Sequence, residues 1–323
     1  MFNQEEFYQL LIAKQYPQAW EMYDVGLTQQ EINRKFDNIP RWNGSDLSGK
    51  NILVWAEQGV GDQIMFGTML KSLLVNNKPM NLVLELDHRL IPLFERSFNR
   101  YSNLSFVPFK KWSISDKYFD YQISMGSLPR YLRTTEEMFL ENRAPYLIAK
   151  NVNKKRLEYN NLSTGWERGK PTIGISWSTQ NKNQDRSIHI SLFDKMVNTD
   201  KYFFVNLDTS RLEQNKIYLD KSINQMKNLD DFATQVAACD LVISIDNTTA
   251  HMAGGLGVQT WLLLNQKPDW RWLEDTSDTL WYRNVDVLRR RLNTAVSGVD
   301  ILRRQDDWGT VFKFMEEKLL NEI

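Results

Sequence analysis

The sequence predicts two consecutive α/β units, each built on a parallel sheet with helices on both faces, as in a Rossmann fold. Short apolar runs alternate with amphipathic helical patterns along most of the chain, which is typical of βαβ units. This alternation stops in a polar stretch at 150–169 and then begins again. A length of 323 residues also suits two domains of ordinary size.

The first unit is expected at 46–148, after a helical lead-in at 1–45. Apolar residues recur at helical spacing over 5–23, and a second short helix is expected over 29–36. A strand, a turn with two glycines and a helix then follow in order, which is the opening of a βαβ unit. The strands expected in this unit cover 51–56, 81–86, 104–107 and 121–124, and a further helix covers 90–98.

The second unit is expected at 149–306. Its first strand lies within 170–177, and the pattern ends with an amphipathic helix over 307–320 inside a C-terminal block at 307–323. The remaining strands are expected at 202–207, 241–245, 260–264 and 285–288, and helices at 191–198, at 230–239 and from about 248.

Composition excludes several classes of protein. The 40 basic and 40 acidic residues cancel, which argues against a dedicated nucleic-acid binder. The apolar runs fall far short of the ~20 residues of a membrane span, although peripheral membrane contact stays open. A single cysteine, Cys239, allows no internal disulfide, and the polar start does not resemble a signal peptide. We therefore expect a cytoplasmic protein.

The first candidate site is the glycine turn after strand 51–56. Gly59 and Gly61 allow close approach to the main chain, and Asp62 stands at the start of the next helix. The turn lacks the third glycine of the dinucleotide fingerprint and the Lys-Ser/Thr pair of a P-loop. From local features alone, Asp62 is either a site residue or a helix cap.

The second candidate site follows strand 241–245, where a helix N-terminus offers free N–H groups to a phosphate. His251, one turn into this helix, is either a site residue or a structural one. Glycines inside a helix cost stability, so Gly254 and Gly255 indicate close packing or a close ligand. The residues proposed for this site are Asp246, Asn247, Thr248, Thr249 and His251.

Two further segments are candidates. A polar loop at 177–188 carries Lys182 and Arg186, although a solvated loop is an equal alternative. The segment 268–272 places two tryptophans around an arginine, which suits stacking on a base or sugar plus a phosphate contact. Four of the eleven tryptophans stand at the carboxyl ends of expected strands and are assigned to the cleft, with core packing as the alternative: Trp55, Trp177, Trp270 and Trp272.

Metal and serine-hydrolase chemistry find little support. The three histidines are far apart in sequence, and the chain has no cysteine cluster, so no metal is expected. The sequence also contains no Gly-x-Ser-x-Gly nucleophile elbow.

Taken in order, several motifs resemble the catalytic region of bacterial tetratricopeptide-linked glycosyltransferases, which is similar to the heptosyltransferase group of glycosyltransferase family nine. The resemblance covers about 40–310. It implies a GT-B fold, with an acceptor-side first domain, a second domain that binds the nucleotide sugar, and a last helix that crosses back to the first domain. The motifs are Glu57 to Asp62, Gly174 to Trp177, Asp185 to Ser187, Asp230 to Ala233, Asp246 to Gly257 and Pro268 to Trp272.

The resemblance also implies roles for individual residues. Asp62 matches the general base, and Arg186, or alternatively Lys182, matches the cation that offsets charge on the leaving diphosphate. The expected function is metal-independent, inverting transfer of a sugar from a nucleoside diphosphate to a hydroxyl of a protein or glycan, with no cofactor. The expected donor-binding residues are Gly59, Gly61, Gln63, Ser176, Trp177, Lys182, Asp246, Asn247, Thr248, Thr249, His251, Trp270 and Trp272.

Two alternatives stay open. One is a catalytically inactive protein of the same fold that binds a nucleotide sugar or a carbohydrate. The other is a nucleotide-sugar epimerase of similar architecture, which converts its substrate without an acceptor.

Overall fold

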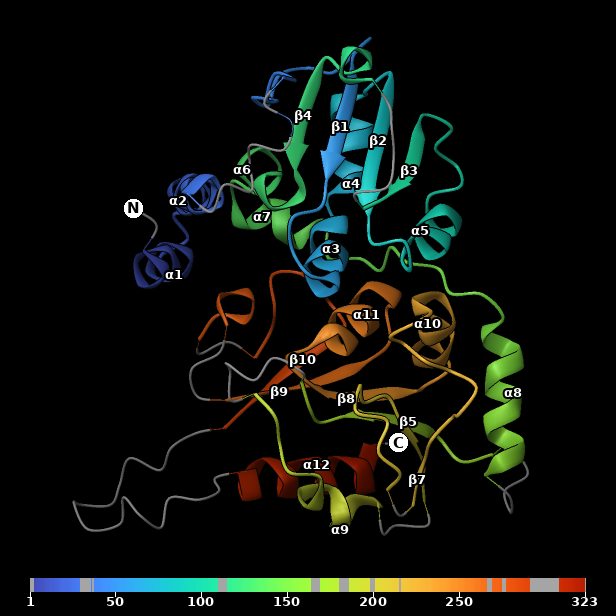
Figure 1. The fold of residues 1–323 in the computed structure, drawn as a ribbon. Coiled ribbons are helices and arrows are strands. Elements are labelled where there is room, and N and C mark those ends of the chain that lie inside the picture. The colour runs from blue at the N-terminus through green and yellow to red at the C-terminus, as the bar shows by residue number, and fades with distance from the viewer. Residues whose placement is uncertain are drawn as a thin grey trace, which may run out of the picture.

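The computed structural model describes residues 3–29, 36, 38–109, 115–163, 169–179, 186–197, 201–214, 216–265, 269–274, 277–290 and 308–322. Two parallel sheets, each flanked by helices, stand one above the other (Figure 1). The predicted α/β class with parallel sheets is therefore confirmed.

The first sheet has four strands in the order β3-β2-β1-β4, and every pair is parallel. Its strands are apolar on both faces because helices cover the sheet, and Ile52 of the central strand lies opposite Leu82 and Tyr121. The strands are β1 (Asn51–Trp55), β2 (Asn81–Leu86), β3 (Leu104–Pro108) and β4 (Tyr121–Ser124). The helices are α3 (Val60–Gly67), α4 (Leu70–Ser72), α5 (Ile91–Ser97), α6 (Pro129–Leu132) and α7 (Glu136–Leu140), with 3-10 turns at η3 (Asp116–Tyr118) and η4 (Met125–Ser127) and a π turn at η2 (Leu73–Asn77).

The second sheet has six parallel strands in the order β10-β9-β8-β5-β6-β7. The two-residue edge strand β7 was not expected from the sequence. The strands are β5 (Thr172–Ser176), β6 (Phe203–Asn206), β7 (Ile217–Tyr218), β8 (Leu241–Ile245), β9 (Thr260–Leu264) and β10 (Val285–Arg289). The helices are α8 (Val152–Leu162), α9 (Asp194–Val197), α10 (Leu229–Ala237), α11 (Thr248–Leu256) and α12 (Trp308–Glu322), with 3-10 turns at η5 (Ile190–Phe193) and η6 (Trp270–Trp272).

The helical lead-in forms two helices, α1 (Gln4–Ile12) and α2 (Tyr16–Gln29), where one was expected over 5–23. The chain breaks between them at Lys14, whose φ of 57° no α-helix accommodates. The short helix expected over 29–36 falls almost wholly outside the described residues.

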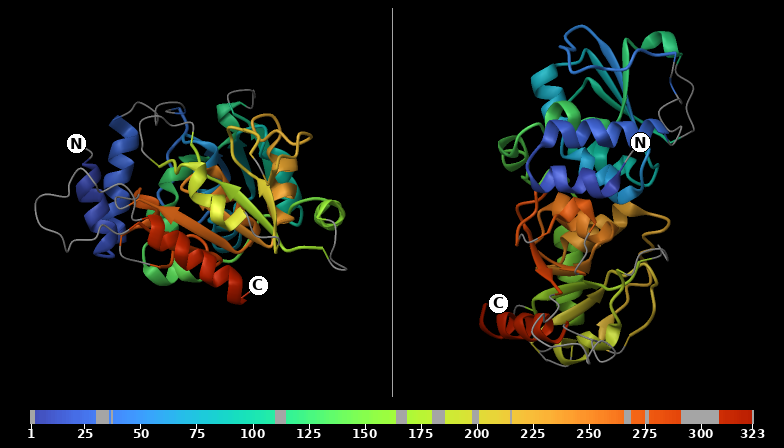
Figure 2. Two further views of the ribbon diagram at one scale, coloured as in Figure 1. Left: turned by 90° about the horizontal axis from the view of Figure 1, so that it is seen from below. Right: turned by 90° about the vertical axis from the view of Figure 1, so that its left-hand side faces the viewer.

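These two helices lie across the junction between the units (Figure 2). Phe7 and Tyr23 pack against Trp270 of the second unit at ring-centroid distances of 5.3 and 5.5 Å. Trp20 donates its indole N–H to the carbonyl of Arg133 in the first unit at 2.9 Å. The lead-in is therefore part of one apolar core that joins both units.

The C-terminal helix α12 does not cross back to the first unit, so that expectation is wrong. It lies along the second sheet, next to α9 (Figure 1). Phe312 packs on Phe193 with ring centroids 4.8 Å apart, and Tyr202 donates its hydroxyl to the carbonyl of Leu319. An apolar face predicts that a helix is covered, but it does not predict which surface covers it. Here the aromatic residues of the second unit provide that surface.

The polar stretch at the predicted domain boundary contains the helix α8. Its sequence has almost no apolar stripe, and among its described side chains only Tyr159 is buried. Tyr159 packs against Phe203 and Tyr218 of the second unit at ring-centroid distances of 5.8 and 6.1 Å, and a polar contact adds to this attachment, with Lys155 paired to Asp220 at 2.9 Å.

Candidate functional site

A cavity of about 550 Å³ lies between the two units, where loops that follow β1, β5, β6, β8 and β9 meet. In open parallel sheets, ligands bind beyond the carboxyl ends of the strands, and here such ends from both sheets border one space. Among the residues predicted for the site, eight line this cavity: Gly59, Gly61, Asp62, Arg186, Asp246, Asn247, Thr248 and His251.

Asp62 lies in the first turn of α3 and does not cap it. The N-cap is Gly59, which offers no side chain, and the Asp62 carboxylate instead reaches across to the second unit. There its Oδ1 accepts a hydrogen bond from Nε of Arg271 at 2.6 Å and lies 2.5 Å from the terminal nitrogen Nη2 in an ion pair. The capping alternative is therefore wrong, and Asp62 forms an ion pair between the two units.

Position 61 has no room for a side chain, so it requires glycine. A Cβ atom built on Gly61 would lie 2.9 Å from Cδ2 of His251, which is closer than real Cβ contacts. The main chain of α3 is thus approached by a histidine of α11. In the same way, Gly254 leaves room for the ring of Tyr282 and Gly255 for Leu147, so close packing explains the helical glycines.

Gln63 is buried and points away from the cavity. Its amide nitrogen donates to the carbonyl of Gln58 at 3.0 Å, and its oxygen accepts from the main chain of Asp87 at 2.8 Å. Its assignment to donor binding is wrong, because both ends of the amide already hold the glycine loop in place.

Asn247 caps α11 and organises the loop after β8. Its Oδ1 accepts from the main-chain N–H of Thr249 at 2.9 Å, and its Nδ2 donates to Ser176 Oγ at 2.8 Å and to the carbonyl of Ser178 at 3.2 Å. This N-cap therefore joins the loops after β8 and β5.

The two threonines of this loop differ. Thr248 lines the cavity, as predicted. Thr249 is buried, and its hydroxyl lies 3.4 Å from both Ser176 Oγ and the carbonyl of Leu207. Because Thr249 and Ser176 lie behind the loop, their assignment to direct donor contact is wrong.

Arg186 forms an ion pair with Asp246 at 2.8 Å and approaches Asp269 at 4.0 Å. Burial raises the pKa of Asp246, and the positive charge of Arg186 opposes this shift. The other predicted cation, Lys182, lies outside the described residues.

His251 is held as a neutral ring. Burial lowers its pKa to about 3, and the nearby charges of Arg271 and Arg186 act in the same direction. The ring stacks on Trp272 at a centroid distance of 4.9 Å, and its Nδ1 lies 3.1 Å from the hydroxyl of Tyr282. His251 thus lines the cavity as part of an aromatic stack.

The four tryptophans assigned to the cleft are buried and none of them lines the cavity, so that assignment is wrong. Trp55 donates its indole N–H to Gln122 at 2.7 Å, and Trp177 belongs to the core under the second sheet. Trp270 packs on the N-terminal helices and Trp272 on His251. A position at the end of a strand does not fix the direction of the side chain, and large aromatic side chains gain most by burial.

Arg271 was not among the residues predicted for the site, although the segment 268–272 around it was a candidate. Arg271 pairs with Asp62 of the first unit and with Asp269 at 2.5 Å, and its guanidinium lies 4.4 Å from the ring centroid of Trp270. Burial alone lowers the pKa of Arg271, but Asp62 and Asp269 outweigh it and raise the pKa above its usual value. The sequence feature that could have identified Arg271 is its position between Trp270 and Trp272.

Two more residues were missed. Asp208 follows β6 and accepts hydrogen bonds from the main-chain N–H groups of Trp177 and Ser178, at 2.9 and 2.6 Å. Arg89 borders the cavity, pairs with Asp87 and donates to the carbonyl of Met226 in the second unit at 3.1 Å. Neither residue belongs to a motif, so only the fold reveals them.

Glu57 lies just behind the cavity, at the end of β1. Burial raises its pKa to about 8, and the negative charge of Asp62 adds to this shift. Its Oε1 accepts from the main chain of Gly126 at 2.7 Å, whereas the buried Oε2 has no hydrogen-bond partner among the described residues. Burial raises the pKa of Tyr23 in α2, and the negative charge of Glu57 adds to this shift.

The charges around the cavity balance. Among the described residues that line it, three arginines face three aspartates, and each arginine already has a carboxylate partner. The described part of the chain contains no group of three or more metal-ligating side chains. It also contains no helix that is long and apolar enough to span a membrane.

Comparison with known proteins gives one relative by sequence. No family model matches the chain. The protein FlbA of Caulobacter vibrioides is 30% identical over 310 residues, which cover 85% of this chain and 50% of FlbA. The chain thus spans about half the length of the curated relative that it matches.

Comparison with solved structures gives relatives of the fold. The α/β fold of the chain is similar to that of the ADP-heptose lipopolysaccharide heptosyltransferase II of E. coli. That structure aligns with a TM-score of 0.52 at 14% identity, over 84% of this chain and 99% of the enzyme. A family 9 glycosyl transferase from Veillonella parvula aligns with a TM-score of 0.47 at 13% identity, over 76% of this chain and 88% of that one.

Proposed function

We propose that the protein is a glycosyltransferase of GT-B type that transfers a sugar from a nucleoside diphosphate to a hydroxyl of a protein or glycan. In this proposal the reaction inverts the anomeric centre, needs neither metal nor cofactor, and takes place in the cytoplasm. The first unit carries the acceptor and the second binds the donor. The fold shared with an ADP-heptose heptosyltransferase supports this substrate class.

One observation carries the proposal. A carboxylate from the first unit, Asp62, and two guanidiniums from the second, Arg186 and Arg271, border the same cavity. Such a cavity provides a proton acceptor on one side and positive charge for a leaving diphosphate on the other.

The ion pair of Asp62 is compatible with its proposed role as general base. Both contacts from Arg271 go to Oδ1, and Oδ2 makes no hydrogen bond within the described part of the chain. Arg271 therefore orients the carboxylate while one oxygen stays available for the proton of the acceptor hydroxyl.

On the donor side, Arg186 must exchange part of its contact with Asp246 for a phosphate oxygen. A phosphate and a carboxylate offer a guanidinium the same two-oxygen geometry, so this exchange preserves its hydrogen bonds. The N-terminus of α11, where Thr248 lines the cavity, adds partial positive charge next to the same phosphate.

Asp62→Asn tests the base. We expect transfer to fall by at least about 100-fold, because general base catalysis contributes about that much or more, while donor affinity changes only a few fold. Asp116→Asn, an exposed aspartate of the first unit, is the matched control. A panel of nucleotide sugars screened by thermal shift first identifies the donor, since a bound donor stabilises the fold. Unchanged turnover in Asp62→Asn excludes this assignment.

The same assays separate the alternatives. Arg186→Ala should weaken donor binding about tenfold, and transfer should survive a chelator. A strict requirement for manganese contradicts the mechanism. Donor binding without hydrolysis or transfer indicates a binding protein, and conversion of the nucleotide sugar without an acceptor indicates an epimerase.

A further inference from the structure

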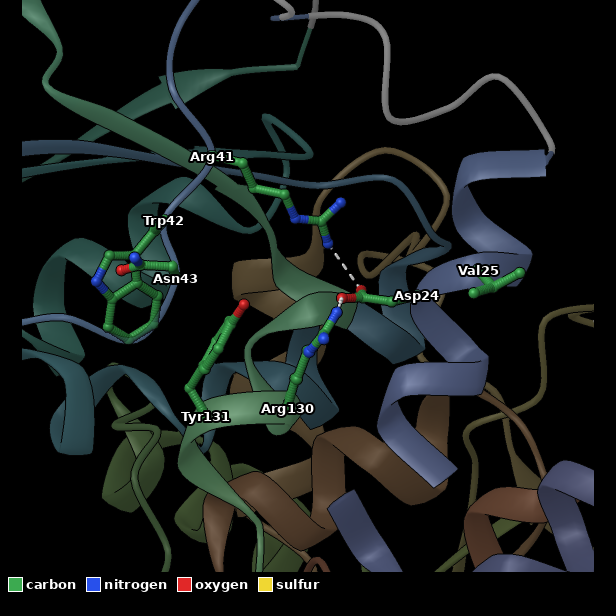
Figure 3. A pocket seen from close by; sticks show the side chains of 7 residues that line it. All are labelled: Asp24, Val25, Arg41, Trp42, Asn43, Arg130 and Tyr131. Carbon is green, nitrogen blue, oxygen red and sulfur yellow. Dashed lines mark hydrogen bonds and ion pairs between the residues drawn. The ribbon is translucent and has the colours of Figure 1, made fainter. Parts of the chain in front are cut away.

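A second cavity, of about 350 Å³, lies on the first unit and shares no lining residue with the cavity between the units. It is enclosed by α2, by the segment 41–43 before β1 and by α6 (Figure 3). Small-molecule sites begin at about this size. Neither the fold comparison nor the proposed transfer assigns a role to it.

Two arginines converge in this cavity on a single buried carboxylate (Figure 3). Asp24 of α2 accepts from Arg41 at 2.8 Å through one oxygen and from Arg130 at 3.1 Å through the other. Arg41 also donates to Ser127 Oγ at 2.7 Å. About a third of each arginine side chain stays exposed.

The charge of this cluster exceeds what a structural clamp requires. One arginine would satisfy Asp24, yet two are present, so the described lining residues carry one excess positive charge. Glu21 approaches Arg130 at 3.5 Å, but it is largely exposed and therefore offsets little of this charge. A guanidinium has five N–H groups, and the contacts above use only some of them.

The opposite wall is aromatic and held in place. The rings of Trp42 and Tyr131 pack at a centroid distance of 5.1 Å, and the Trp42 indole donates to the carbonyl of Ser45 at 2.8 Å. Gly44, with φ of 88°, brings the chain against Tyr131, where a Cβ atom would lie 2.6 Å from the ring. The Tyr131 hydroxyl points toward the space beside the arginines (Figure 3).

We propose that this cavity is a binding site for a small molecule that carries an oxyanion, either a carboxylate or a phosphate. Arg41 and Arg130 bind the oxyanion, because a planar guanidinium matches its paired oxygens. Tyr131 contacts the body of the ligand, and the fully buried Trp42 holds the Tyr131 ring in place. The site is independent of the proposed transfer reaction, since its residues do not border the cavity between the units.

Titration calorimetry with three probes tests the site: D-glucuronate carries a carboxylate, glucose 6-phosphate carries a phosphate, and glucose is neutral. We expect one or both anionic probes to bind, with affinity that falls as salt rises, and glucose not to bind. Binding of only one anionic probe identifies which oxyanion the site takes.

Variants of the whole chain locate the bound probe. Arg41→Gln and Arg130→Gln should each weaken probe binding at least tenfold, whereas Arg186→Gln in the other cavity and Arg100→Gln on the surface should leave it unchanged. Arg130→Lys keeps the charge next to Asp24 but loses the planar fork, so it should fold normally and still bind several fold more weakly.

Three results overturn the proposal. These are no binding of either anionic probe, a loss of binding that follows Arg186→Gln, and a lowered melting temperature in the Arg130 variants with unchanged probe affinity. The last result identifies the cluster as a clamp between α2 and the first unit.

Discussion

The loop after β1 and the loop after β8 occupy equivalent places in the two units, yet they are stabilised in different ways. The loop after β8 is held by its own unit, because Asn247 caps α11 and ties the loop to Ser176. The loop after β1 begins a helix with no side-chain cap, and its Asp62 is held by Arg271 of the other unit. The geometry of the proposed base therefore depends on the contact between the units, whereas the proposed donor loop is formed independently of that contact.

The largest effect is expected from Arg271→Met. It leaves Asp62 and Asp269 without their shared cation in a mostly buried site, and breaking such a pair typically costs about 3 kcal/mol of unfolding free energy. Urea denaturation measures the loss. The exposed pair Lys221–Glu213 provides the control, since solvent screens this pair and Lys221→Met should cost much less stability. If Arg271→Met and Lys221→Met lost equal stability, the ion pair of Asp62 would hold the loop after β1 no more firmly than an exposed surface pair does.

The next effect concerns Glu57, at the start of the loop after β1. Its pKa is raised from 4.5 to about 8, so the folded state holds a proton that the unfolded state releases, and this contribution to stability is lost as the pH rises toward 8. Between pH 6 and pH 8, the native protein should lose about 2 kcal/mol more stability than Glu57→Gln does. Urea denaturation at both pH values measures this.

A control and a contrary result are available for this prediction. Glu213→Gln should leave the pH dependence unchanged, since Lys221 lowers the pKa of Glu213 and this exposed carboxylate stays ionised across the range. Parallel pH profiles for native protein and Glu57→Gln would show that Glu57 is ionised in the fold.

Asn247→Ala tests the loop after β8, which is held by its own unit. It should cost about 1–2 kcal/mol of unfolding free energy, because it removes an N-cap together with the bonds to Ser176 and Ser178. Asn228→Ala is the matched control: Asn228 caps α10 through the same type of bond, but its side chain makes no hydrogen bond to another loop among the described residues. It should cost about 1 kcal/mol or less. A larger loss in Asn228→Ala would show that the cross-loop bonds add nothing.

The smallest effect is a gain. Gly59→Ser supplies the missing cap of α3 at a position with φ of −64°, and its Cβ meets only Asp62 Oδ2 at 3.7 Å. We expect about 0.5 kcal/mol of added stability, seen as a small rise in melting temperature. Gly49→Ser, at φ of 72°, should instead destabilise the protein. A loss in Gly59→Ser would mean that the loop needs glycine for another reason.

The sequence located the strands of both sheets closely, except for the two-residue edge strand β7. Strands such as Asn51–Trp55 and Leu241–Ile245 are covered on both faces, so each appears as a short apolar run with a turn behind it. Positions of the glycine turn and of Asp246 to Thr248 followed from these strands, because loops at the carboxyl ends of parallel strands are fixed by the strand order.

The sequence did not determine which way individual side chains point or what they meet. It placed Trp177 and Trp272 in the cleft, and both are buried. It gave Gln63 and Thr249 to the ligand. Gln63 instead bonds to the main chain of Gln58 and Asp87, and the Thr249 hydroxyl lies 3.4 Å from the carbonyl of Leu207. Such choices depend on the competition between burial, local hydrogen bonds and a cavity, which no local pattern records.

What the sequence determined by itself is the pair of parallel sheets and the loops at their ends, since periodicity and burial are local properties of the chain. Only the tertiary structure decided that Asp62 meets Arg271 across 209 positions, that Gly61 makes room for His251, and that α12 lies on the second sheet. These contacts arise where two separately patterned surfaces pack together, and each depends on the shape and charge of its partner.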